Sequence, residues 1–62
     1  MKYIVGMKFK VKQTVKDPIK LSEGDILTIR KIEKARVYCS INKSRMMQEI
    51  DINNLSNQLE SI

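Results

Sequence analysis

One segment near the middle of the chain, residues 21–33, restricts the possible fold more than any other. It consists of a short polar turn that ends in Gly-Asp, followed by a run rich in β-branched residues. Gly24 can adopt the positive φ of a tight turn, and the Asp25 carboxylate can accept hydrogen bonds from nearby backbone. The β-branched residues that follow favour a pleated strand. The segment therefore predicts a tight turn that leads into a strand over residues 25–33.

The size and composition of the chain indicate one small globular domain over residues 1–62. Of its 62 residues, 42% are hydrophobic and 31% are charged, which is typical of a folded domain rather than a disordered segment. The single cysteine, Cys39, excludes an internal disulfide and predicts a reducing compartment. The apolar opening over residues 3–7 is too short for a signal peptide core or a membrane span. We therefore expect a soluble, cytoplasmic protein without a membrane partner.

Alternation of apolar and polar residues predicts the first strand over residues 7–12. The apolar positions of this strand should face the core, and they are Met7, Phe9 and Val11. The positions between and after them are lysines that should face away from it, namely Lys8, Lys10 and Lys12. The alternation then stops, and Asp17-Pro18 predicts a bend in a long loop over residues 13–20. Ile19 and Leu21 are expected to return towards the core beneath this loop.

The same alternation predicts a strand over residues 36–41. Its inward residues should be Val37, Cys39 and Ile41, and its outward residues Arg36 and Tyr38. In the preceding strand, Lys31 falls on the apolar face, which predicts a bulge or a strand end near Lys31. Residues 42–45, Asn-Lys-Ser-Arg, are typical of a hairpin turn.

A fourth strand is expected over residues 46–51. It should bury Met46 and Ile50, direct Gln48 towards the same side and leave Met47 exposed. Residues 52–55 predict one tight helical turn. Two structures are possible for the tail: a helix that places Leu55, Leu59 and Ile62 on one face, or a short closing strand.

Short strands, a long first loop and a terminal tight turn are typical of a small barrel, and two segments resemble the SH3 domain. The first segment matches an apolar residue and a Gly-Asp turn before the second strand, at Leu21, Gly24, Asp25, Ile26, Leu27 and Ile29. The second matches a core residue, a tight turn and another core residue, over residues 50–55. The resemblance covers residues 7–56 in the order of elements. It implies an all-β, SH3-like barrel of four to five strands with a terminal tight helical turn.

The chain departs from the SH3 domain at the positions that bind proline-rich helices, which fit grooves between aromatic rings. It lacks the Ala-Leu-Tyr-Asp-Tyr segment of that family and has no tryptophan. Asp51 stands in place of the groove proline, and Asn54 in place of a groove tyrosine. We therefore expect a polar, shallow surface at these positions and no binding of proline-rich peptides.

Catalytic and metal-binding functions lack the residues that they need. The chain has no histidine, so Cys39 lacks the usual base for a nucleophile, and we expect this thiol in the core. One thiol without an imidazole cannot form a zinc site, and Glu23 and Asp25 offer too few ligands for calcium. The two glycines stand singly and form no phosphate-binding loop. We predict a protein that is not an enzyme and binds no cofactor or metal.

The net charge of +5 originates in the first 16 residues, which hold five lysines and no acid, whereas the other seven basic and seven acidic residues cancel. Lysines two positions apart on a strand lie about 7 Å apart, close to the phosphate spacing of a nucleic-acid strand. The alternative is a solvated face that keeps a small barrel soluble and prevents pairing between edges. Tyr38 beside Arg36 can stack on a base or pack against neighbouring strands.

We predict a protein-interaction module, such as a small adaptor or an inhibitor or regulator of a larger protein. Met47 is the expected contact with that protein, or with a second copy in a homodimer. The alternative is a small nucleic-acid-binding barrel. Its binding face would comprise Lys8, Lys10, Lys12, Lys16, Arg36 and Tyr38.

Overall fold

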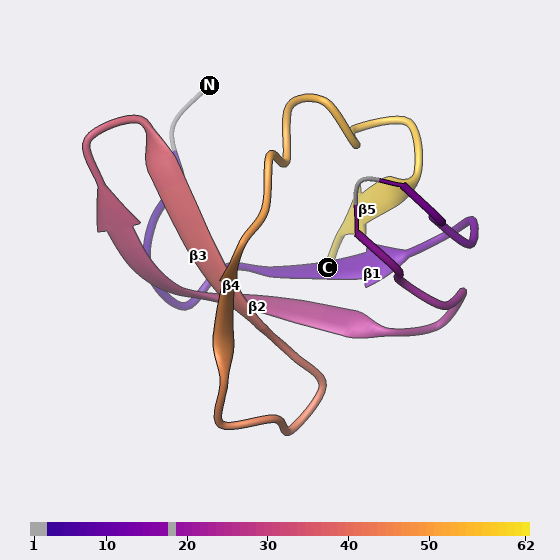
Figure 1. Cartoon of the computed structure of the whole chain (residues 1–62), viewed down its shortest axis with the longest axis horizontal. Coiled ribbons are helices and arrows are strands. Elements are labelled where there is room, and N and C mark those ends of the chain that lie inside the picture. The colour runs from indigo at the N-terminus through magenta and orange to yellow at the C-terminus, as the bar shows by residue number, and fades with distance from the viewer. Residues whose placement is uncertain (1–2, 18) are drawn as a thin grey trace.

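The computed structural model describes residues 3–17 and 19–62, which form a five-stranded antiparallel sheet (Figure 1). The strands are β1 (Lys8–Val11), β2 (Ile26–Glu33), β3 (Arg36–Ile41), β4 (Met47–Glu49) and β5 (Leu59–Ser61). Their order in the sheet is β4-β3-β2-β1-β5, so the last strand returns to pair with the first. In these described ranges the chain forms no helix, and hence no helix that could cross a membrane. The predicted all-β class is confirmed.

The alternation predicted for β1 is present. Phe9 and Val11 are buried, Met7 is half-buried against the core, and the three lysines of the segment are exposed. β1 is paired on both sides, with β2 and with β5. The lysine side chains therefore project from the middle of a sheet rather than from a free edge.

The first loop folds back on the core as predicted. Val15 and Leu21 exchange two backbone hydrogen bonds of 2.8 Å, and both side chains are buried. Ile19 is partly buried beside them. The bend predicted at Pro18 lies outside the described residues. Gly24 ends the loop with a φ of +96°, which confirms the predicted turn before β2.

The register of β2 against β3 shifts between Ile29 and Lys31, which confirms the predicted bulge. This shift lets Lys31 point to solvent after two buried residues on the same strand. In β3, Val37 and Cys39 are buried, whereas Ile41 is only half-buried at the margin of the core.

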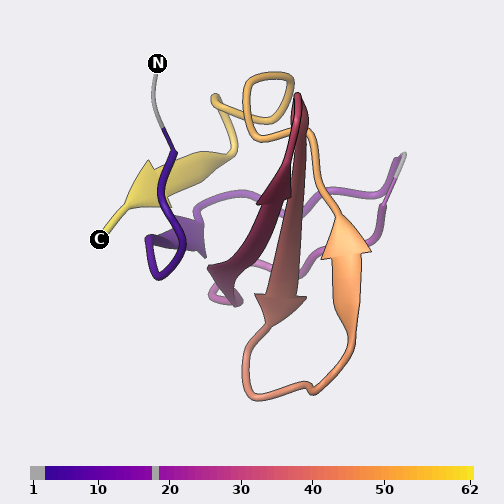
Figure 2. The same cartoon turned by 90° about the vertical axis from the view of Figure 1, so that its left-hand side faces the viewer.

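The predicted inward side of the fourth strand is wrong at two positions, because Met46 is 73% exposed and Gln48 is exposed as well. Met47 is 50% exposed, which confirms the prediction for that residue. The turn between β3 and β4 projects beyond the rest of the sheet (Figure 2), and every residue from 42 to 49 is exposed. Only Ile50, which follows β4, is buried as expected.

The segment after β4 consists of turns from residue 52 to residue 58, and the expected helical turn is not shown. Leu55 and Leu59 are buried, but Ile62 is 70% exposed. The tail forms β5, so the closing strand is the correct one of the two expected structures, and the shared helical face is wrong. In the pairing of β5 with β1, Leu59 lies opposite Val11.

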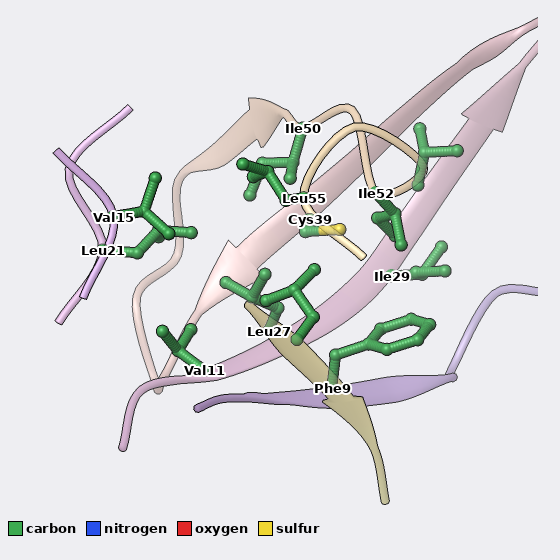
Figure 3. Packing of buried hydrophobic residues seen from close by; sticks show 12 residues of the cluster. Phe9, Val11, Val15, Leu21, Leu27, Ile29, Cys39, Ile50, Ile52 and Leu55 are labelled. Atoms are coloured by element: carbon green, nitrogen blue, oxygen red, sulfur yellow. The ribbon is translucent and has the colours of Figure 1, made fainter. Parts of the chain in front are cut away.

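The core is one cluster of twelve buried side chains from the sheet, the first loop and the turns after β4 (Figure 3). They are Phe9, Val11, Val15, Leu21, Leu27, Ile29, Val37, Cys39, Ile50, Ile52, Leu55 and Leu59. Tyr3 packs its ring against Phe9 in an edge-on arrangement, with centroids 6.3 Å apart. This contact places the N-terminal segment against the core.

Candidate binding groove and charged surfaces

A groove of about 540 Å³ opens where the N-terminal segment, the β2–β3 hairpin and residues 49–53 meet. Aliphatic side chains from all three segments line it, namely Ile4, Ile32, Ala35, Val37, Ile50 and Ile52. Ile4 is 66% exposed and Ile32 is 37% exposed, so much of this apolar surface is open to solvent. Clustered apolar surface in a concave site is typical of a place where a ligand or another protein binds.

The floor of the groove is fixed by the chain after β4. Ile50 donates its backbone hydrogen to the Val37 carbonyl at 2.9 Å, which continues the pairing with β3. The Asp51 side chain then accepts a hydrogen bond from the Asn54 backbone at 3.2 Å and turns the chain. As a result, Ile50 and Ile52 present apolar atoms to the groove while most of each side chain is buried in the core.

One wall of the groove is held by the N-terminal segment. The Tyr3 hydroxyl donates a hydrogen bond to Oδ1 of Asn53, and its ring contacts Phe9. Gly6 donates to the Ile29 carbonyl at 2.8 Å, which attaches this segment to β2. Tyr3 and Ile4 therefore hold a defined position beside the groove.

Charged residues of both signs surround the apolar lining. Lys34 and Arg36 lie at the end of the β2–β3 hairpin, whereas Glu49 and Asp51 lie on the opposite segment. The surface at Asp51 is thus a groove with an apolar floor, which corrects the expectation of a polar, shallow surface there. Asn54 is exposed and does not line it.

The predicted lysine face is present, but acidic residues lie beside it. Lys10 is directly opposite Glu60 in the pairing of β1 with β5. A second hollow, of about 500 Å³, is lined by Lys10 and Lys12 together with Glu23 and Glu60. The carboxylates reduce the positive potential of this surface, which weakens its attraction for a phosphate backbone.

The other predicted binding residues are separated from the lysines of β1. Lys8, Thr28, Ser40 and Met47 form one row across the sheet, as the strand registers show. Arg36 lies four positions before Ser40 on β3, about 13 Å along the strand from that row. It belongs to the groove instead. Lys16 is exposed on the first loop.

Tyr38 lies on the same face of the sheet as the row that runs from Lys8 to Met47, and a neighbouring lysine lies over its ring. The Lys31 ammonium lies 5.8 Å from the centroid of the Tyr38 ring, and Glu49 is opposite Tyr38 on β4. Lys31 also forms an ion pair of 3.0 Å with Glu33, and this hydrogen bond raises the pKa of Lys31. A base that stacks on Tyr38 would have to displace Lys31, so the arrangement agrees with packing between strands.

Cys39 lies in the core, as predicted, with no exposed surface. Burial raises the pKa of the thiol to about 11, which keeps it protonated and unreactive near neutral pH. Among the described residues, no three side chains of histidine, cysteine, aspartate or glutamate are grouped so that they could hold a metal ion.

The groove is the feature that sequence reasoning did not find. Its exposed residues Ile4 and Ile32 are 28 positions apart, and only the pairing of the strands brings them together. One signal was present in the sequence: Ile32 follows the predicted bulge, and a bulge reverses which residues of a strand face outward.

Comparisons with protein-family models, with curated proteins and with solved structures found no match to this chain.

Proposed function

We propose that the protein is a protein-interaction module that binds an extended, apolar segment of a larger protein in the groove. The observation that supports this proposal most directly is the open apolar lining at Ile4 and Ile32, which lie outside the buried core cluster. Apolar side chains of a partner would bury them, and burial of apolar surface is the main favourable contribution to protein association.

We further propose that the fold is an SH3-like barrel. The succession of a first strand, a long folded-back loop, a Gly-Asp turn and antiparallel hairpins supports this proposal, as does the turn segment between Ile50 and Leu55. The groove adjoins Asp51, which stands where that family has its groove proline. Its chemistry differs, because aliphatic side chains and a single tyrosine replace the aromatic rings.

Two neighbouring residues provide a matched test of the groove. Ile4 lines the groove and is 66% exposed, whereas Val5 is 61% exposed and does not line it. The experiment selects peptides from a library of short random sequences on the wild-type protein and measures the affinity of the enriched peptides for both variants. We expect Ile4→Lys to weaken binding by about tenfold or more, because it places a charge on desolvated apolar surface. Val5→Lys should bind as the wild type does.

Two results would contradict this function. One is a selection that enriches no peptide above background on the wild-type protein. The other is an enriched set of peptides whose binding Ile4→Lys leaves unchanged. Chemical-shift mapping of the wild-type protein with an enriched peptide gives an independent readout, with changes expected at Ile32, Val37 and Ile52.

A second candidate function is nucleic-acid binding by Lys8, Lys10 and Lys12. All three side chains are exposed, two of them on β1 and Lys12 directly after it, which supports this candidate, whereas Glu23 and Glu60 beside them oppose it. Binding through these lysines should weaken steeply with salt concentration, and their replacement by glutamine should flatten that dependence. Absence of binding to single-stranded and double-stranded nucleic acid at low salt would exclude this candidate. Glu60→Gln should strengthen such binding if the lysines are the contact.

A further inference from the structure

One edge of the sheet, formed by β4, is unpaired among the described residues. β4 is the last strand on its side of the sheet, and no strand of the described residues covers its other side (Figure 2). The Ile50 backbone hydrogen points to β3, where it meets the Val37 carbonyl at 2.9 Å. Because inward and outward backbone groups alternate along an antiparallel strand, the groups of Met47 and Glu49 point away from β3. They are available to another strand.

The side chains at this edge do little to prevent such pairing. Edge strands of soluble proteins usually carry lysine, proline or a bulge that blocks association. β4 contains one charged residue, Glu49, and two exposed methionines lie at its start. Met46 is 73% exposed and Met47 is 50% exposed, so a partner strand would cover apolar surface as well as backbone groups.

The sequence of this edge is complementary to itself in the antiparallel direction. Residues 45–49 read Arg-Met-Met-Gln-Glu. If two copies pair about Met47, each Met47 lies opposite the other, and Arg45 of each copy lies opposite Glu49 of the other. In this register, positions 45, 47 and 49 of one copy pair with positions 49, 47 and 45 of the other. The backbone groups of Met47 and Glu49 that point away from β3 would then form the hydrogen bonds between the copies. Opposite charges across a strand pair stabilise it, and two-fold symmetry provides this pair twice.

We propose that a second copy of the chain occupies the β4 edge and forms a symmetric dimer centred on Met47. The strand has three residues, and pairing would extend it to Arg45, which lies in a bend before β4. An edge this short buries less than the roughly 1,000 Å² of a stable interface. The dimer is therefore weak and forms as the protein concentration rises.

Charge reversal provides the first test. Arg45→Glu and Glu49→Arg each place like charges opposite one another twice in the dimer, so each variant alone should associate about tenfold more weakly than the wild type in sedimentation equilibrium. An equal mixture of the two variants should recover the wild-type association, because a mixed dimer again pairs opposite charges at both positions. Circular dichroism of each variant checks that the fold is retained.

Cross-linking tests the register. In the proposed dimer the two Met47 positions form a hydrogen-bonded pair, with Cα atoms about 5.5 Å apart, which is within the range that a disulfide spans. Met47→Cys should form a covalent dimer with oxidised glutathione, which takes up two electrons and the two thiol protons and becomes two molecules of reduced glutathione. Gln48→Cys is the matched control and should cross-link far less, since Met46 lies opposite Gln48. Buried Cys39 does not compete.

Three results would overturn the proposal. These are a chain that stays monomeric at millimolar concentration, charge-reversed variants that associate as the wild type does, and cross-linking at Gln48→Cys in preference to Met47→Cys. The dimer assays contain no peptide, so their failure leaves the groove function standing. Glu49 lines the groove as well as the edge, whereas Arg45 does not, so Arg45→Glu separates the two surfaces.

Discussion

The side-chain amide of Asn42 donates a hydrogen bond to Oδ1 of Asp25 at 3.2 Å and thereby joins the turn after β3 to the turn before β2. Asp25 also fixes its own turn, and Asn42 makes a second side-chain bond to the start of β2. The other Asp25 oxygen accepts a hydrogen bond from the Ser22 backbone at 3.0 Å, and Oδ1 of Asn42 accepts one from the Ile26 backbone at 2.9 Å. Asn42 adopts a φ of 55°, which asparagine tolerates better than most residues. One residue thus stabilises two turns through its side chain and its backbone.

Substitutions at Asn42 should separate the contribution of its side-chain hydrogen bonds from that of its backbone conformation. Asn42→Gly retains a backbone suited to positive φ but loses both side-chain hydrogen bonds, and we expect it to lower the free energy of unfolding by about 1–2 kcal/mol. Asn42→Ala loses the same bonds and adds about 1 kcal/mol of backbone strain. Urea denaturation measures both values. Equal stability of the two variants would show that the backbone conformation contributes nothing.

Burial in the core predicts that alanine substitutions at two residues paired across β2 and β3 lower the stability by very different amounts. Leu27 has no exposed surface, whereas its partner Ile41 is half-buried at the margin of the core. Leu27→Ala should cost about 2–5 kcal/mol, which is comparable with the whole stability of a domain this size. Ile41→Ala should cost clearly less, because the space left by the removed side-chain atoms is open to solvent. Urea denaturation with both variants tests this order, and similar losses would contradict the burial difference.

Much of the fold follows from local sequence, because each correct prediction depends on a pattern within a few residues. The alternation around Phe9 is a property of one strand, and the turn at Gly24 needs only the conformational freedom of that residue. The bulge beside Lys31 was predictable because a cation cannot stay on a buried face.

The parts that local sequence did not predict depend on where the core ends. Met46 continues the alternation that leads to Ile50, yet it comes just before β4 and is 73% exposed. Lys34 adopts a φ of 55° in the β2–β3 turn without the glycine or asparagine that usually signals this conformation. Likewise, Ile4 and Ile32 form a groove only after distant segments pair. No pattern within one strand contains that information.

Cys39 should make the stability of the protein depend on alkaline pH. Its thiol ionises near pH 9 when unfolded, but burial raises the pKa in the folded protein to about 11. As the pH rises from about 9 to about 11, the unfolded chain therefore loses a proton that the folded chain keeps. The free energy of unfolding falls over this interval, and the stability contributed by the neutral buried thiol is present below it.

Cys39→Ala removes this titration and provides the comparison. All other side chains are the same in both proteins, so the difference in unfolding free energy between wild type and variant is the informative quantity. We expect that difference to be constant below about pH 8 and to shrink as the pH rises towards 11. In the native state at neutral pH, the wild-type thiol should also resist a thiol reagent. Rapid labelling would contradict the buried position.

Proline-rich peptides should not bind measurably, although the groove is apolar. A polyproline helix gains affinity when its prolines fit between parallel aromatic rings, and such ridges require several rings. Tyr3 is the one aromatic residue in the groove lining, and its hydroxyl and ring edge are engaged by Asn53 and Phe9. Titration of labelled protein with a proline-rich peptide tests this, with a peptide enriched in the groove selection as the positive control. We expect shifts at Ile32 and Asp51 only with the control peptide. Saturable shifts at those residues with the proline-rich peptide would contradict this prediction. They would mean that an aliphatic groove can bind the proline-rich ligands that SH3 domains bind between aromatic rings.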